Sequence, residues 1–510
     1  MGSHHSHTSA PATDGGSSSG SGTSTPRGGS RRGTGRSGSS DSQAQEKPPA
    51  PSLVPIEKLA KLLVQKSQKE DGINGVTEKV LTKYVFPLYP ELARYFHSYA
   101  RRATSARAQH VPLAAFRTHC ERLMVLLDDA AILEAYVRMF SADDEGGQVK
   151  REGVRALLHT CYKLSMDHYP EGPQTCLKIH QTLSAVVDGC FGKADTHSVG
   201  FVVRWLQENC PRLILPVHRY CVHTLATRHR ELEAHIDGNG DGAGLELATP
   251  VLERSAWDVH GVARGLLPVS VAWLLAGALP PLYSRPHAPP APPPHDPHRA
   301  MLASAAWVAR LVCALPSHWV LLYTSREHGL GANRFLHHTL GYRGPTLILV
   351  QGGSKSEGAG AGGVTMAVAS AQEWRESHQY WGNNECALLQ VFPVLAMLER
   401  APKMLYLNTS IRGYPRGLRA GSDPRKPLLS IHEDFEMMEY RGTPYSLDAL
   451  EVWGCGDTAS RETQLEIKKW QIKEAERQRQ VKLSPADWME HPDRYLLELA
   501  GRPQYNNSAS

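Results

Sequence analysis

The chain has 510 residues, enough for two or three domains with buried cores, and a net charge of only +5. Its 56 Lys and Arg residues nearly balance 51 Asp and Glu residues, which argues against a nucleic-acid-binding protein. The nine cysteines form no Cys-x-x-Cys pair. The sequence therefore predicts neither a disulfide framework nor a zinc ribbon, and a reducing cytosol is the expected compartment.

The first segment, residues 1–51, consists mainly of Ser, Gly, Thr, Pro and Arg. It carries too few large apolar side chains to offset the entropy of ordering, so it is predicted to be disordered. It also lacks the apolar stretch of a secretory signal peptide.

The chain begins MGSHHS, which matches the N-myristoylation pattern on Gly2. A chance match or an expression tag would look the same. One acyl chain binds a membrane only weakly, so a second signal is needed. Anionic lipid headgroups could provide it by attracting four nearby arginines. These are Arg27, Arg31, Arg32 and Arg36.

Residues 52–285 show apolar side chains at helical spacing and are predicted to form an all-α domain. One predicted helical face contains Phe116, Cys120, Leu123 and Leu127. The longest apolar run, residues 266–280, is shorter than a bilayer span and has a proline near each end. A buried helix is the expected structure there.

Two acidic, glycine-rich stretches of this region resemble EF-hand loops. Asp237, Asn239 and Asp241 stand at the first three ligand positions of one loop, but its twelfth position is Ala248. The second stretch, residues 143–149, has Gly153 where the bidentate carboxylate should stand. The sequence thus predicts an EF-hand-like fold without tight calcium binding, and ordinary acidic turns are the alternative.

Residues 286–300 form a proline-rich linker, which is predicted to be an extended spacer. The same composition could bind an SH3 or WW module.

Residues 316–456 contain short apolar runs separated by Gly, Pro and Asn, the pattern of a series of strands. A short helix is expected near residues 330–340. Three stretches stand out in order: WVLLYTSREHG at 319–329, GYRGPTLILV at 341–350 and LEVWGCG at 450–456. Between them lie a lone Trp374, a Tyr-x-Gly step at 380–382 and a cysteine-containing strand at 385–392.

This ordered set resembles the TLDc domain family. The resemblance implies a β-sandwich with flanking helices, so the expected fold class is α+β: EF-hand-like helices, then the sandwich, then a C-terminal helix. It also implies a non-enzymatic regulator that needs no cofactor, binds the vacuolar proton-pumping ATPase and protects against oxidative stress.

The branch of the family that is N-myristoylated, lysosomal and mTOR-associated is the most similar. Similarity to this branch implies components of the mTOR complex as further partners. The expected location is then cytoplasmic and peripheral on lysosomal or endosomal membranes, held by the acyl chain and the Arg-rich N-terminus.

The last segment, residues 457–510, is predicted to be a helical extension with a narrow apolar stripe. A solvated helix with internal ion pairs is one interpretation. Trp470 favours another, because an exposed tryptophan on a polar helix often anchors an interface. Since segments beside the domain bind the ATPase in this family, Ile467, Lys468, Lys469 and Trp470 are predicted to form a partner-binding surface.

Two other classes of function stay open at this point. Ser325 and His328 could serve a hydrolase, although no Gly-x-Ser-x-Gly elbow is present. A calcium-responsive adaptor would use Asp237, Asn239 and Asp241. Cys386 and Cys455 could be redox sensors, but their apolar surroundings favour structural burial.

Overall fold

The computed structural model describes residues 54–102, 109–141, 147–167, 178–236, 265–284, 315–316, 318–353, 363–479, 496 and 499–501. The predicted disordered segment 1–51 and the linker 286–300 lie outside these ranges. Among the described residues, no helix is both long and apolar enough to span a bilayer.

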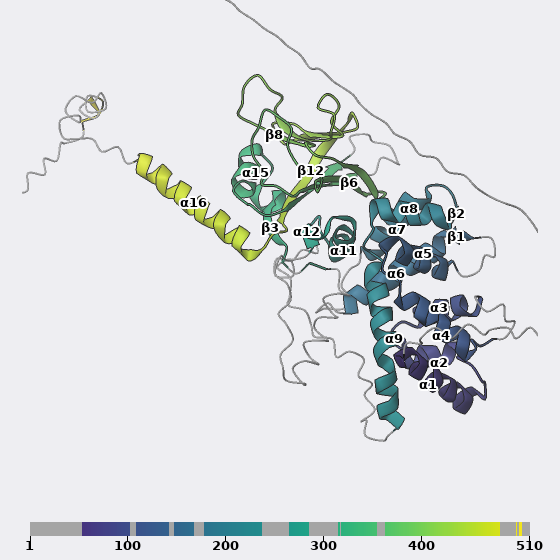
Figure 1. Cartoon of the computed structure of the whole chain (residues 1–510). Helices are drawn as coiled ribbons and strands as arrows, with labels where there is room; N and C mark the ends of the chain where they lie inside the picture. The colour runs from purple at the N-terminus through teal and green to yellow at the C-terminus, as the bar shows by residue number, and fades with distance from the viewer. Residues whose placement is uncertain are drawn as a thin grey trace, which may run out of the picture. The chain divides into compact units, whose positions relative to one another are not determined.

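The helical region begins with helices that lie against one another (Figure 1). Their buried apolar residues belong to one core. Thr77 and Asp128 cap two of them by accepting hydrogen bonds from the backbone N–H groups of Val80 and Ala131. The bounds are α1 (Val54–Asp71), α2 (Glu78–Tyr84), α3 (Pro90–Arg102), α4 (Leu113–Met124) and α5 (Asp129–Phe140).

One predicted helical face was partly wrong. Phe116, Cys120 and Leu123 are buried in α4 as expected, but Leu127 is 91% exposed. The helix ends at Met124, so Leu127 no longer follows the helical repeat. Apolar spacing alone did not reveal this helix end.

Two helix–loop–helix units follow, joined by a short antiparallel ladder in which Val149 pairs with His197. This arrangement agrees with the predicted EF-hand-like fold. The bounds are β1 (Gln148–Lys150), α6 (Arg151–Asp167), α7 (Ile179–Phe191), β2 (Thr196–Ser198) and α8 (Val199–Asn209).

The loop that pairs with the first unit lies between α7 and β2, a position that the sequence did not indicate. Cys190 at the end of α7 and Gly192 and Ala194 in this loop stand where an EF-hand would carry oxygen ligands. Because these three positions hold no carboxylate, no calcium pattern marks this loop.

The helical region ends with α9 (Leu215–Ile236), α11 (Val269–Ala278) and α12 (Pro281–Ser284). Every described residue of α11 from Ser270 to Ala278 is buried. This confirms the buried helix predicted for the longest apolar run.

The second half of the chain forms one antiparallel sheet in the order β7-β6-β5-β4-β12-β11-β10-β9-β8, with β3 paired to β12. Its strands are β3 (Val320–Thr324), β4 (Thr346–Gly353), β5 (Val364–Ser370), β6 (Ala387–Phe392), β7 (Ala396–Arg400), β8 (Leu405–Asn408), β9 (Gly417–Ala420), β10 (Leu429–Ile431), β11 (Met437–Tyr440) and β12 (Thr443–Gly454). The associated helices are α14 (Ser325–His328), α15 (Ala332–Thr339) and α16 (Thr458–Arg479).

Side-chain alternation shows how this sheet becomes a sandwich. Ile348 and Val350 of β4 belong to the same core as Leu405, Leu418 and Ile431, so the two ends of the sheet pack face to face. The alternate residues of β4 belong instead to the core of the helical region. The predicted α+β fold, with helices, sandwich and C-terminal helix in that order, is confirmed.

Hydrogen bonds also join the helices to the outer face of the sandwich. The backbone N–H of Leu395 donates to the carbonyl of Ala185 at 2.8 Å, and that of Met397 donates to Asn209 Oδ1 at 2.7 Å. Arg400 adds a hydrogen bond to the carbonyl of Ala278 at 2.7 Å. The edge around β7 is therefore covered by helices.

Candidate partner-binding helix and its surroundings

The N-terminal part of α16, called its base below, is hydrogen-bonded to the sandwich region through a buried glutamine. Gln464 Nε2 donates to the carbonyls of His338 and Leu340, at 2.9 and 3.1 Å. These carbonyls lie at the C-terminal end of α15, where the helix itself offers no N–H partners. Gln464 thus ties the C-terminal helix to the end of another helix.

The two most distinctive sequence stretches meet at this base. The backbone N–H of Gly456 donates to Tyr342 Oη at 2.9 Å. A Cβ atom added to Gly454 would lie 2.6 Å from the Tyr342 ring, so only glycine fits there. The end of β12 and the start of α16 are therefore positioned by Tyr342.

Positive and imidazole groups gather where α16 meets α15. The rings of His328 and His338 are 3.8 Å apart. Burial lowers the pKa of His338 to about 4, with further contributions from His328 and Lys468. Burial also lowers the pKa of Lys468 to about 8, and the charge of Arg461 adds to this effect. At neutral pH the His338 imidazole is therefore uncharged, and the positive charge at this contact comes from side chains of α16.

The predicted partner-binding residues divide between two environments. Ile467 and Lys468 are half-buried, and Ile467 packs over Gly341, where an added Cβ would lie 3.7 Å from it. Lys469 and Trp470 are exposed, Trp470 to 64%. Half of the predicted surface thus holds α16 on its own domain, and the other half faces solvent.

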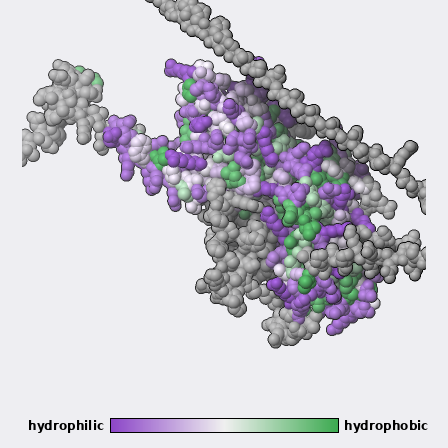
Figure 2. Space-filling model, viewed as in Figure 1, coloured by the Kyte–Doolittle hydropathy of each residue, from purple (hydrophilic) through white to green (hydrophobic). Residues whose placement is uncertain are grey.

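Two exposed apolar residues of α16 were not included in the predicted surface. Leu465 is 41% exposed and Ile472 is 55% exposed. They are seven residues apart, so they lie on one helical face together with Lys469. Figure 2 shows such apolar spots on an otherwise polar helix. Their spacing of i and i+7 in the sequence could have indicated that they belong to the same surface.

The side chains of Ser325 and His328 accept hydrogen bonds from backbone N–H groups. Ser325 Oγ accepts a hydrogen bond from the N–H of Leu450 at 3.0 Å, and His328 Nδ1 accepts one from the N–H of Thr324 at 3.2 Å. No hydrogen bond between the two side chains is found in the part of the chain that the structure describes. This geometry gives no support to a nucleophile–base pair.

Asp237, Asn239 and Asp241, proposed above as calcium ligands, lie outside the described residues. Within the described ranges, no group of three His, Cys, Asp or Glu side chains is arranged to hold a metal ion. An arginine from the first EF-hand-like unit, at the start of α6, reaches the loop of the second unit. Arg151 donates to the carbonyls of Gly192 and Ala194, at 2.9 and 3.1 Å, and also contacts Asp188.

The two cysteines of the sandwich are buried and unpaired, as their apolar surroundings predicted. Burial raises the pKa of the Cys455 thiol well above its ordinary value, which disfavours the reactive thiolate. Gly2 and the four arginines of the N-terminal segment lie outside the described residues, so membrane anchoring stays a prediction.

Comparison with known proteins agrees with the resemblance described above. The TLDc domain family model matches residues 297–456, so the match begins ahead of β3. MTOR-associated protein MEAK7 of Danio rerio is 28% identical over 169 residues, which cover 30% of this chain and 36% of that protein. The protein of the same name from Gallus gallus is 26% identical over 167 residues, or 29% of this chain and 34% of the relative.

A second group of relatives has a different name. Restriction of telomere capping protein 5 of Pyricularia oryzae is 26% identical over 264 residues, covering 37% of this chain and 41% of that protein. The chain thus matches only about a third of the length of the first relatives and about two fifths of this one.

Proposed function

Since residues 297–456 form a TLDc domain, we propose that this TLDc-family regulator binds the vacuolar proton-pumping ATPase at lysosomal and endosomal membranes. It acts there by binding rather than by turnover. The proposal includes a link to mTOR signalling, because two relatives are named as mTOR-associated proteins. It also includes a role in resistance to oxidative stress, which the family resemblance implies.

The observation that carries the proposal is the contrast between the two ends of α16. The base is held by Gln464 and by Ile467 on Gly341. Beyond it, Trp470 and Ile472 expose more than half of their surface. A rigid helix that presents exposed apolar anchors among charged residues is suited to insertion into a groove of a protein partner.

Membrane recruitment is the second part of the proposal. Acylation of Gly2 would supply one weak signal, and the N-terminal arginines would supply the electrostatic second. Replacing Gly2 with alanine should move the protein from the membrane fraction to the cytosol in cells. Unchanged fractionation of Gly2→Ala would remove the acyl anchor from the proposal.

The first experiment compares capture of ATPase subunits from lysate by the full chain and by a chain that ends at Gly456. We expect recovery with the full chain and loss on truncation. Point variants then locate the contact: Trp470→Ala and Ile472→Ala should each weaken capture by about tenfold, as expected for interface anchors.

Gln471→Ala is the matched control, since Gln471 is exposed on the same helix and alanine preserves helix propensity. Equal capture by all variants and by the truncated chain would exclude α16 as the contact. Failure of the full chain to recover any ATPase subunit would contradict the proposed partner.

A further inference from the structure

A pocket opens on the outer face of the sandwich, away from the α16 contact. Strands β8 and β9 pair so that Tyr406 lies directly opposite Arg419. Their neighbours Leu405, Leu407 and Leu418 are buried in the sandwich core, so side-chain alternation turns Tyr406 and Arg419 outward.

A tyrosine from another segment covers this face. Trp381 and Leu405 form a bridge with backbone hydrogen bonds of 2.8 and 2.9 Å, which places Tyr380 beside Tyr406. The two rings stack with centroids 5.0 Å apart at 29°. Tyr406 Oη also donates to the carbonyl of Pro415 at 2.7 Å. Tyr406 is therefore fixed in position and only 2% exposed, although it points out of the core.

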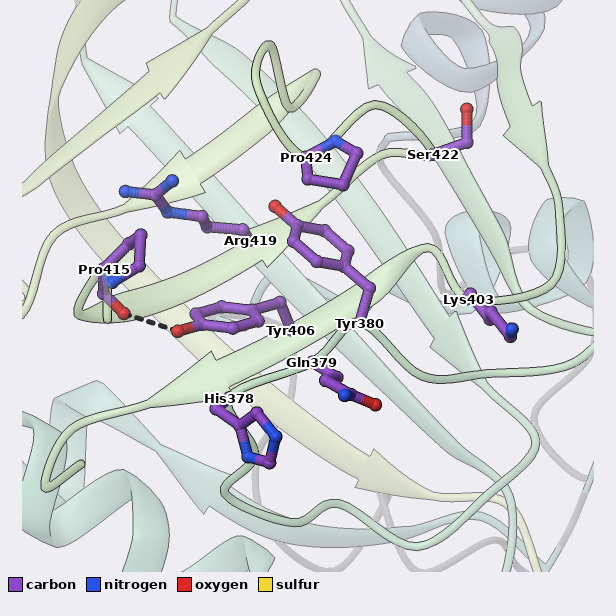
Figure 3. A pocket seen from close by; sticks show the side chains of 9 residues that line it. All are labelled: His378, Gln379, Tyr380, Lys403, Tyr406, Pro415, Arg419, Ser422 and Pro424. Carbon is purple, nitrogen blue, oxygen red and sulfur yellow. Dashed lines mark hydrogen bonds between the residues drawn. The ribbon is translucent and has the colours of Figure 1, made fainter. Parts of the chain in front are cut away.

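The cavity beside these rings has a volume of about 500 Å³. That is within the usual range of small-molecule sites. Figure 3 shows Arg419 and Lys403 on opposite sides of Tyr380, and Pro415 and Pro424 form further apolar walls. The remaining lining residues are His378, Gln379 and Ser422.

The lining carries positive charge and no carboxylate. Two acidic side chains accept backbone hydrogen bonds near the segment that carries Ser422 and Pro424: Asp423 from Arg425 N at 2.9 Å, and Glu399 from Ser422 N at 3.1 Å. Both stand outside the set of lining residues. The positive charge of the pocket is thus available to an anion.

A buried polar atom at the pocket lacks a partner. Arg419 Nε is buried and has no hydrogen-bond partner in the described part of the chain. The Tyr380 hydroxyl is also buried, and the Arg419 side chain lies within hydrogen-bonding reach of it. Burial raises the pKa of Tyr380, while the nearby charge of Arg419 opposes this rise. Buried donors of this kind usually find a partner, so a ligand that accepts hydrogen bonds would complete the site.

We propose that this pocket binds a small organic oxyanion, a planar ring that carries a phosphate or carboxylate group. The oxyanion would lie against Arg419, because a guanidinium pairs with such groups through two parallel hydrogen bonds. The ring would lie against Tyr380, whose face favours aromatic contact and which Tyr406 supports from behind by stacking. Lys403 is exposed at the far side and adds a weaker, salt-screened attraction.

The test uses the full chain and titration calorimetry with phenyl phosphate as the probe. We expect saturable binding that is about tenfold tighter than that of inorganic phosphate or of neutral benzyl alcohol. Arg419→Gln should weaken phenyl phosphate binding by about tenfold or more. The affinity of Arg419→Lys should lie between those of the parent and Arg419→Gln, because lysine keeps the charge but loses the paired hydrogen bonds. Tyr380→Phe should also weaken binding, through loss of the hydroxyl.

Lys426→Gln is the control, since it removes a positive charge from the neighbouring loop without changing a lining residue. Thermal melting of each variant separates lost binding from lost folding, and Tyr380→Phe keeps the test valid if Arg419→Gln does not fold. Equal weakening by Lys426→Gln, equal affinity for inorganic phosphate, or no phenyl phosphate binding would each overturn the proposal. None of these results depends on the ATPase.

Discussion

At the scale of single residues, a buried glutamate connects the helical region to the sandwich. Glu451 accepts hydrogen bonds from the N–H of Leu266 at 2.9 Å and from Trp453 Nε1 at 3.1 Å. Its place in the LEVWGCG stretch did not indicate this role. The structure shows instead that it serves two buried donors.

Glu451→Leu should therefore destabilise the protein by about 1–3 kcal/mol for each donor left unsatisfied. Burial raises the pKa of Glu451, so its ionised form is itself costly in the fold. Glu451→Gln should lose less stability than Glu451→Leu, because glutamine keeps a hydrogen-bond acceptor without the buried charge. Urea unfolding of both variants measures the difference, with exposed Glu433→Leu as the control. Equal stability of Glu451→Leu and the parent would contradict this role.

A second glutamate should make the sandwich sensitive to acid. Glu376 accepts hydrogen bonds from Thr409 N at 2.8 Å and from the hydroxyls of Thr409 and Ser410 at 2.5 and 3.0 Å. Burial alone would raise its pKa, but these hydrogen bonds outweigh burial and hold the pKa below the ordinary value of 4.5.

A depressed carboxyl pKa in the folded state stabilises the protein above the unfolded-state pKa, and this stabilisation is lost as the pH falls through the folded-state pKa. Glu376→Gln should thus lower the stability of the protein near neutral pH. Below about pH 4.5 the variant should lose less stability with falling pH than the parent, since its glutamine has no carboxylate to protonate. Melting temperatures across the acid range measure this. Parallel profiles for Glu376→Gln and the parent would be inconsistent with the argument.

At the scale of elements, predictions from periodicity were the most successful. The strands of residues 316–456, the short helix near residue 335 and the C-terminal helix all form. What the sequence concealed were contacts made by polar residues. Gln464 looks like part of a solvated helix, but it is fully buried. The loop after α7 pairs as an EF-hand-like unit although its first three ligand positions hold no side-chain oxygen. The pocket beside Tyr406 depends on pairing between β8, β9 and Trp381, which local pattern does not specify.

Gln464 leads to a prediction about α16. Gln464→Ala removes both hydrogen bonds to the end of α15, so α16 should open more readily while the sandwich stays folded. Amide hydrogen exchange should rise across residues 458–479 and remain unchanged across β4 and β5. Gln471→Ala provides the exposed control on the same helix. Faster exchange throughout the sandwich would show that α16 is part of its cooperative unit.

At the scale of the whole molecule, two glycines in adjacent helices test how tightly the helices pack on the sandwich. A Cβ added to Gly189 in α7 would lie 2.3 Å from the carbonyl oxygen of Leu395. A Cβ added to Gly200 in α8 would meet no atom within 4 Å. Replacing a helical glycine with alanine is otherwise stabilising by about 0.5–1 kcal/mol.

The same substitution should therefore have opposite effects at the two positions. Gly200→Ala should raise the melting temperature. Gly189→Ala should lower it, because the methyl group forces α7 away from Leu395, whose N–H donates to Ala185 of the same helix. Paired thermal melts provide the measurement, and each glycine is the control for the other. An increase at both positions would mean that α7 can move away from the sandwich without cost. Lower stability at Gly189 alone would show that α7 is packed tightly against the sandwich.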